Sequence, residues 1–281
     1  LENSLRPVFV DVHPDYFDLD PTKIEAAIGP KTHAILVPHL FGQPADMAAI
    51  QTIAKKHGLT IIEDACQTPF AEYQGHPVGF WGEITCFSTY AAHIFSTGVG
   101  GLAVTRHARL ASLLRSLAFH GRDPAYNRIE DDDDQHTLPR IIKKRFLFPY
   151  RGYSYRITEM EAALGLAQFT TYRRALRIRQ QNAQYLIRKL QPLEHSLQLP
   201  RVKTDATHVF MVFPLVILNP NIRRDKLILF LERRGIETRY LLPLLSQPAY
   251  RDLHIRSADF PVAQRLANRG FYIGCHADLS K

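Results

Sequence analysis

The first 64 residues alternate between short apolar stretches and amphipathic stretches, and this alternation limits the possible folds more than any other feature. The predicted strands are 8–12, 33–39 and 59–64, and the predicted helices between them are 20–28 and 46–58. Strands that alternate with helices form a parallel sheet covered by helices on both faces. Such a sheet places its chemistry at the carboxyl ends of its strands, where Asp64 is located.

The rest of the chain predicts more strands, a long helix and a second, smaller unit. We expect strands at 84–88 and 101–105, a helix at 108–119 and a long helical stretch up to about residue 190. The fold class is therefore α/β, a mainly parallel sheet domain followed by a smaller C-terminal α+β domain. The expected division is a large domain over 1–155, one long connecting helix over 156–190 and a small domain over 191–281.

Composition favours a globular enzyme in a reducing compartment. The 281 residues are 46% hydrophobic, which is enough to bury a large core. The longest apolar run, 208–218, is short and is interrupted by Pro214, so we expect no membrane span. Cys66, Cys86 and Cys275 are far apart and form no CxxC pair, which predicts a cytoplasmic protein without a metal cluster.

The formal charge of +8 favours an anionic partner, such as a nucleotide or a phosphorylated sugar. Much of this charge lies in the stretch "YRRALRIRQQNAQYLIRKL", residues 172–190. There the basic side chains are distributed around a helix instead of forming one stripe, as on a solvated helix face. We therefore expect no nucleic-acid binding.

Four residues in a fixed order predict a cofactor site. Asp64 ends one strand, Gln67 follows it, Ser88 ends another strand, and His93 stands before the glycines of "STGVGG". A carboxylate at a buried strand end can keep a pyridinium nitrogen protonated, and a serine beside backbone N–H groups can hold a phosphate. Each feature alone also has a structural explanation: a capping carboxylate, a turn serine, a packed histidine, a glycine turn. Their order together favours pyridoxal phosphate.

The chain resembles the DegT/DnrJ/EryC1/StrS family of pyridoxal-phosphate-dependent nucleotide-sugar aminotransferases over nearly its whole length. The resemblance is carried by "FVDVHPDYFDLDPTKIEAAI", "HLFGQPADMAAIQTIAKKHGLTIIEDACQT", "CFSTY…GVGG", "RGYSYRITEMEAALGLAQ", "RRGIETR" and "FPVAQRLANRGFYIGCH". It implies the aspartate aminotransferase fold (fold type I), a nucleotide-linked keto sugar as substrate and a homodimer with the active site at its interface.

The resemblance also implies roles for the four residues. Asp64 matches the partner of the pyridine nitrogen, Gln67 a contact of the cofactor ring and Ser88 a phosphate ligand. His93 stands where the family has its Schiff-base lysine, and an imidazole cannot form that bond. A histidine can still act as a base near neutral pH, because its unperturbed pKa is about 6.5.

With pyridoxamine phosphate bound without a covalent link, a base at His93 favours loss of the C3 hydroxyl from a nucleotide-linked 4-keto sugar. The family contains such a branch, the sugar 3-dehydratases, which carry histidine at this position. One sub-branch uses an iron–sulfur cluster bound by closely spaced cysteines, a pattern that this sequence lacks. The resemblance therefore implies a cluster-free dehydratase.

Two further departures from the family pattern bear on the site. The family usually begins with a segment that supplies another phosphate loop, and the printed chain opens after it, so we expect an N-terminally truncated domain. The family also often has asparagine where this chain has Ser154, at a point that reaches the other subunit's phosphate. Substrate-binding residues are not identified by the sequence.

Two alternatives to dehydration stay open. Ordinary amino transfer from a donor such as glutamate would need His93 to move the proton between carbons. A degenerate family member would keep the fold as a non-catalytic binding or regulatory subunit.

Overall fold

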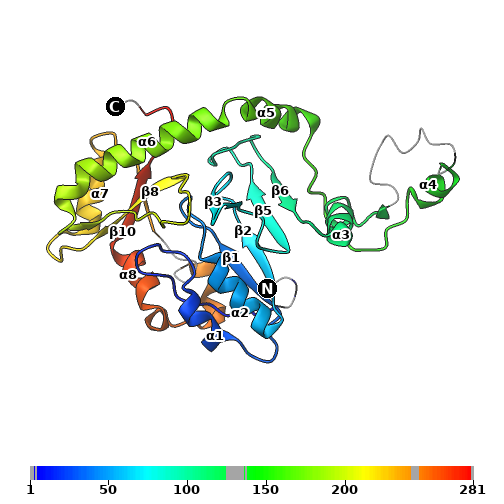
Figure 1. The fold of residues 1–281 in the computed structure, drawn as a ribbon, viewed down its shortest axis with the longest axis horizontal. Helices are drawn as coiled ribbons and strands as arrows, with labels where there is room; N and C mark the ends of the chain where they lie inside the picture. The colour runs from blue at the N-terminus through cyan, green and yellow to red at the C-terminus, as the bar shows by residue number, and fades with distance from the viewer. Residues whose placement is uncertain (1–2, 4, 125–135, 137, 242–246, 280–281) are drawn as a thin grey trace.

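The computed structural model describes the chain except residues 1–2, 4, 125–135, 137, 242–246 and 280–281. Two four-stranded sheets and a two-stranded hairpin organise the described residues (Figure 1). The hairpin, β3 (Glu72–Tyr73) with β4 (His76–Pro77), was not predicted. No helix among the described residues is long and apolar enough to cross a membrane.

The first sheet is mainly parallel, as predicted. Its strands are β1 (Ala34–Pro38), β2 (Thr60–Asp64), β5 (Ile84–Ser88) and β6 (Gly101–Val104), in the spatial order β1-β2-β5-β6. The first three are parallel, and β6 runs antiparallel to β5. The carboxyl ends of β2 and β5 therefore meet at one edge, which brings the strand-end residues of both strands together.

Helix α2 (Met47–His57) covers the β1 end of this sheet, after a 3-10 turn (Pro21–Lys23) and the short α1 (Ile24–Ala27). The Asp46 carboxylate accepts a hydrogen bond from the Ala49 N–H at 3.1 Å and so caps the first turn of α2. The helix ends at Gly58, which has φ 62°, a conformation that glycine adopts without steric cost. Its apolar side chains pack on those of β1 and β2 in one core cluster.

The strand predicted at 8–12 does not form. Val12 makes only an isolated bridge to Leu19. The Asp11 carboxylate accepts hydrogen bonds from the N–H groups of Val262 (3.0 Å) and Ala263 (2.9 Å), in the first turn of α8 (Pro261–Arg269). This segment is fixed by capping a distant helix, which its apolar alternation cannot reveal.

The second sheet is antiparallel and lies in the C-terminal part of the chain. Its strands, in spatial order, are β7 (Leu197–Gln198), β8 (Val212–Ile217), β10 (Gly270–Gly274) and β9 (Thr238–Tyr240). Alternate side chains of β8 pack in opposite clusters. Phe213 and Leu215 lie with residues of α6 (Tyr172–Leu190) and α7 (Arg224–Glu232), whereas Val216 lies with Leu266 of α8. Helices on both faces explain why β8 reads as one continuous apolar run.

The single connecting helix expected over 156–190 is two helices, α5 (Glu159–Phe169) and α6 (Tyr172–Leu190). The break falls at Thr170 and Thr171, whose hydroxyls donate to the carbonyls of Ala167 (2.7 Å) and Gln168 (3.3 Å). Such side-chain bonds compete with the helical backbone bonds. The boundaries of the predicted domains stay a prediction.

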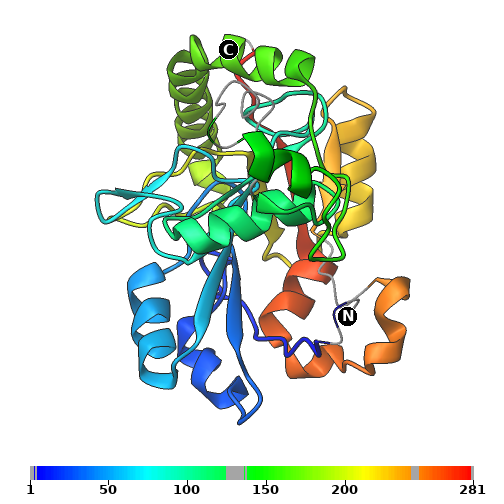
Figure 2. The ribbon, with the colours of Figure 1, turned by 90° about the vertical axis from the view of Figure 1, so that its right-hand side faces the viewer.

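In the described part of the chain between β6 and α5 lie two further helices. They are α3 (Ala108–Ala118) and α4 (Leu138–Lys144), and they extend from the β6 side of the first sheet (Figures 1 and 2). After α4 the chain returns to the end of α3, where the Tyr153 N–H donates to the Leu117 carbonyl at 2.7 Å. This return positions Ser154, which forms a bridge with Phe119.

Candidate active site at the carboxyl edge of the parallel sheet

Asp64 is the last residue of β2 and lies half-buried at the carboxyl edge of the sheet. Its Oδ1 accepts a hydrogen bond from the Cys66 N–H at 3.2 Å. Burial, together with the nearby Asp64 carboxylate, raises the pKa of the Cys66 thiol to about 12. A carboxylate has about four acceptor positions, so Asp64 retains capacity for a further N–H donor from a ligand.

The loop between β5 and β6 is closed by its own backbone. Thr89 N–H donates to Gly100 O (3.0 Å), Ala91 N–H to Gly98 O (2.9 Å) and Thr97 N–H to Thr89 O (2.8 Å). Gly100 has φ 134°, and a Cβ there would lie 2.9 Å from Ile157 Cγ2, so a larger residue would be strained and crowded. The glycines predicted to admit a phosphate thus serve to fold this loop tightly.

His93 is held in this loop beside Ser88. Its backbone N–H donates to the Tyr90 carbonyl at 2.9 Å, and its Nδ1 lies 3.2 Å from Ser88 Oγ. Burial lowers the pKa of His93, while the negative charge of Asp64 acts in the opposite direction. The imidazole is therefore neutral near pH 7. The structure brings Asp64, Ser88 and His93 to one edge of the sheet.

Gln67 lies at the same edge but has a structural bond that the sequence did not predict. Its Oε1 accepts a hydrogen bond from the Phe41 N–H at 2.7 Å. Phe41 has φ 61°, an unusual value for a bulky residue, so the bond helps to fix a strained turn after β1. The ring contact predicted for Gln67 stays a prediction.

Glu63 is the important residue that the sequence analysis missed. It points to the face of β2 opposite Asp64, is 0% exposed, and accepts hydrogen bonds from His39 Nε2 (3.0 Å), Gly79 N (3.2 Å), Gly82 N (2.5 Å) and Thr85 Oγ1 (3.1 Å). A charged residue in an apolar strand was the available signal.

His39 joins this buried network to the strand that carries Asp64. Its Nδ1 accepts a hydrogen bond from the Ala45 N–H at 3.1 Å, so its single imidazole proton is on Nε2, which faces Glu63. Its backbone N–H donates to the Asp64 carbonyl at 2.9 Å. Burial raises the pKa of Glu63. The hydrogen bonds from His39 and from the backbone lower it by more than burial raises it, so the net pKa lies below the ordinary value.

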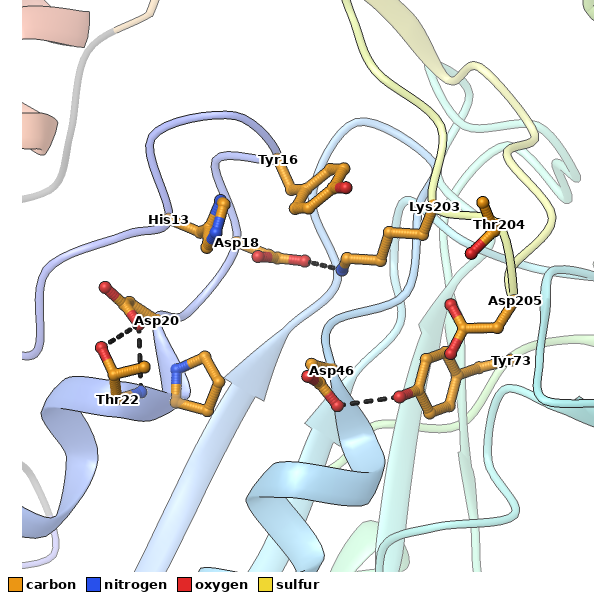
Figure 3. A pocket seen from close by; sticks show the side chains of 11 residues that line it. His13, Tyr16, Asp18, Asp20, Thr22, Asp46, Tyr73, Lys203, Thr204 and Asp205 are labelled. Carbon is orange, nitrogen blue, oxygen red and sulfur yellow. Dashed lines mark hydrogen bonds and ion pairs between the residues drawn. The ribbon is translucent and has the colours of Figure 1, made fainter.

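A separate hollow of about 320 Å³ lies near the N-terminus of α2 and contains none of the four predicted site residues (Figure 3). Lys203 reaches across it to the Asp18 carboxylate and to the Pro44 carbonyl, and Asp46 accepts a hydrogen bond from the Tyr73 hydroxyl at 2.8 Å. These polar groups therefore already pair with one another, and the contact of Lys203 with Asp18 joins the 199–207 segment to the N-terminal loop.

Within the described ranges, no group of three or more His, Cys, Asp or Glu side chains could hold a metal ion. Cys66, Cys86 and Cys275 are all free thiols.

Known proteins resemble this chain over nearly its whole length. The GDP-perosamine synthase of Caulobacter vibrioides is 33% identical over 277 residues, which are 98% of this chain and 69% of that protein. The dTDP-4-dehydro-2,6-dideoxy-D-glucose 3-dehydratase of Saccharopolyspora spinosa is 31% identical over an alignment of 291 positions that covers 100% of this chain and 63% of that protein. The chain thus spans about two thirds of the length of these relatives.

A solved structure shows the same architecture. DesV of S. venezuelae superposes with a TM-score of 0.84 at 30% identity, covering 98% of this chain and 68% of that one. This superposition confirms the predicted α/β fold class.

The family model described as the DegT/DnrJ/EryC1/StrS aminotransferase family matches residues 1–281. The predicted family and enzyme class are therefore confirmed, and the predicted pyridoxal phosphate is the cofactor of that family. The chain belongs to the DegT/DnrJ/EryC1/StrS aminotransferase family.

Proposed function

We propose that the protein is a pyridoxal- or pyridoxamine-phosphate enzyme that removes the C3 hydroxyl from a nucleotide-linked 4-keto sugar, with His93 as the base. The observation that carries this proposal is the position of the His93 imidazole at the carboxyl edge of the sheet, where its Nδ1 lies 3.2 Å from Ser88 Oγ. Burial lowers the pKa of His93 there, although the charge of Asp64 opposes the shift. A primary amine in that loop would favour amino transfer, and the loop sequence from Ser88 to Gly101 contains none.

The residues at this edge suit the cofactor. Asp64 retains acceptor capacity for a pyridinium N–H, and Ser88 offers a hydroxyl at the end of the neighbouring strand. The bound cofactor would supply an electron sink for a carbanion. His93, neutral near pH 7, would accept a proton at an imidazole nitrogen and return it to the departing C3 hydroxyl, which leaves as water.

The relatives support the substrate class, and they leave two candidate reactions, amino transfer and dehydration. The S. spinosa relative is described as a 3-dehydratase of a dTDP-linked keto sugar, and the C. vibrioides relative as a synthase of GDP-perosamine. Both act with nucleotide-linked sugars, and the histidine favours the dehydratase. Amino transfer is the second candidate, and a non-catalytic family member is the third.

The product of the reaction tests the proposal. The purified protein is incubated with pyridoxamine phosphate and a nucleotide-linked 4-keto-6-deoxy sugar, and the sugar is followed by mass spectrometry. We expect a mass loss that corresponds to one water. An amino sugar that appears only with glutamate would establish amino transfer instead, and an unchanged sugar without any cofactor absorbance would establish the non-catalytic alternative.

We also propose that the protein works as a homodimer in a reducing compartment. The support for the dimer is the exposed apolar side chains of α5, where Met160 is 78% and Leu166 70% exposed. Exposed apolar patches of this kind mark protein interfaces. Ser154 is also exposed and stands shortly before α5 in the sequence. The resemblance implies that the family residue at this position reaches the other subunit. The support for the reducing compartment is that Cys66, Cys86 and Cys275 are free thiols.

Sedimentation velocity tests the dimer. We expect the protein to sediment as a dimer at micromolar concentration, and a Met160→Glu, Leu166→Glu variant to sediment as a monomer, because two charges cannot be buried there without partners. Leu229→Glu, at a similarly exposed leucine on α7, is the matched control and is expected to leave the dimer intact. A monomeric unmodified protein would contradict the proposal.

A further inference from the structure

The Ser88 hydroxyl has two polar contacts among the residues that the structure describes. Its Oγ accepts a hydrogen bond from the Tyr90 N–H at 3.2 Å and lies 3.2 Å from His93 Nδ1. The His93 N–H donates in turn to the Tyr90 carbonyl at 2.9 Å. These short-range bonds hold the hydroxyl and the imidazole together within one turn of the loop.

The hydroxyl of Ser88 can meet His93 in two ways. It has one hydrogen and two lone pairs, and one lone pair is used by Tyr90 N–H. If the Ser88 O–H donates to Nδ1, the imidazole carries its proton on Nε2. If Nδ1–H donates to the second lone pair of Ser88, then Nε2 is unprotonated and the Ser88 hydrogen is available to another acceptor.

The choice matters because the His93 imidazole is neutral. Burial lowers its pKa, although Asp64 opposes the shift, so the ring holds a single proton near pH 7. The partner of one ring nitrogen then decides which nitrogen is protonated. Only an unprotonated nitrogen can act as a base.

We propose that Ser88 is a positioning residue that sets the tautomer of His93 according to whether the cofactor phosphate is bound. Without an anion, the Ser88 O–H donates to Nδ1 and the proton is on Nε2. When a phosphate oxygen accepts the Ser88 O–H, Nδ1 becomes the donor to Ser88 and Nε2 becomes the free base. Nε2 loses one proton to water and Nδ1 gains one from water, so the charge of the ring is unchanged.

This inference rests on the proposed function, because it needs a phosphate at Ser88 and a base at His93. It adds a consequence that the proposed function lacks. The base is in its competent tautomer only when the cofactor is in place, so the empty protein cannot remove a proton from a substrate at this position.

Two-bond ¹H–¹⁵N correlation spectra of protein labelled with ¹⁵N-histidine distinguish the two tautomers. The chain has 13 histidines, and the His93 signals are identified by their loss in His93→Asn. We expect the Nε2–H pattern in the free protein and the Nδ1–H pattern with saturating pyridoxamine phosphate. Pyridoxamine, which lacks the phosphate, is expected to leave the Nε2–H pattern unchanged.

Variants of Ser88 separate the switch from simple binding. Ser88→Ala is expected to abolish the change of tautomer, whereas Ser88→Thr, which keeps the hydroxyl, is expected to retain it. Binding of pyridoxamine phosphate is measured independently by calorimetry. Bound pyridoxamine phosphate with an unchanged tautomer, or a change that persists in Ser88→Ala, would overturn this inference alone.

Other outcomes bear on the proposed function. Absence of binding to the unmodified protein would overturn both proposals. Normal dehydration with one tautomer throughout would leave the proposed function intact and reject the switch.

Discussion

Replacing Glu63 with alanine is expected to lower the free energy of unfolding by about 5 kcal/mol or more. The substitution leaves the His39 ring N–H, the N–H groups of Gly79 and Gly82 and the Thr85 hydroxyl without their acceptor. Each buried donor that loses its acceptor costs about 1–3 kcal/mol. Urea unfolding followed by circular dichroism measures the loss, and a change below about 1 kcal/mol would contradict the role of Glu63.

Two further variants keep this test informative if Glu63→Ala does not fold. Glu63→Gln keeps one carbonyl oxygen but turns an NH₂ group toward donors, so we expect a smaller but clear loss. Glu25→Ala removes a carboxylate that pairs with Lys56 and His57 on the surface, and is expected to have a far smaller effect than Glu63→Ala.

The effect of pH on the Glu63 network follows from the sign of its pKa shift. The net pKa of folded Glu63 is lowered, so its stabilisation is present above the unfolded value of about 4.3 and is lost as the pH falls through the folded pKa. Glu63→Gln should remove that part of the acid sensitivity.

Replacing His93 with asparagine is expected to lower kcat for dehydration about 10²–10⁴-fold, because this is the usual contribution of a general base. Asparagine keeps a polar group near Ser88 but cannot accept a proton near pH 7. His195→Asn, at an exposed histidine after α6, is the control and is expected to retain full activity. Initial rates of water loss from the sugar provide the measurement, and an unchanged kcat in His93→Asn would exclude His93 as the base.

The pH profile and a lysine variant sharpen this test. Burial lowers the pKa of His93, so the base stays neutral to lower pH and the acid limb of the rate should lie below about 6.5. His93→Asn should lose that limb. His93→Lys should lose dehydration; if instead it gains amino transfer above the level of the unmodified protein, the second candidate function is favoured.

Local sequence signals were sufficient for most helices and strands. The predicted strands at 84–88 and 59–64 correspond to β5 and β2, and the predicted helix at 46–58 corresponds to α2 with its cap Asp46 and its terminal Gly58. These elements combine apolar periodicity with their own start and stop residues, so neighbours in sequence define them. Strand β10, which the sequence analysis missed, has a glycine at each end and gains its register from β8 and β9.

Where the sequence analysis failed, a distant partner decided the outcome. The apolar stretch at 8–12 is no strand because Asp11 caps α8 about 250 residues later in the chain. Glu63 stayed unnoticed because its donors come from His39 and from the stretch 79–85, which only the folded chain brings together around its carboxylate.

By itself the sequence determined the order of the elements, the family, and the place of Asp64 and Ser88 at strand ends, since alternation, caps and motif spacing are local properties of the chain. The tertiary structure decided how the side chains pair. It placed His93 Nδ1 against Ser88, assigned the Gln67 oxygen to Phe41 and placed Glu63 within the His39 network. The physical reason is that each buried polar group must find a partner, and the available partners depend on which segments pack together.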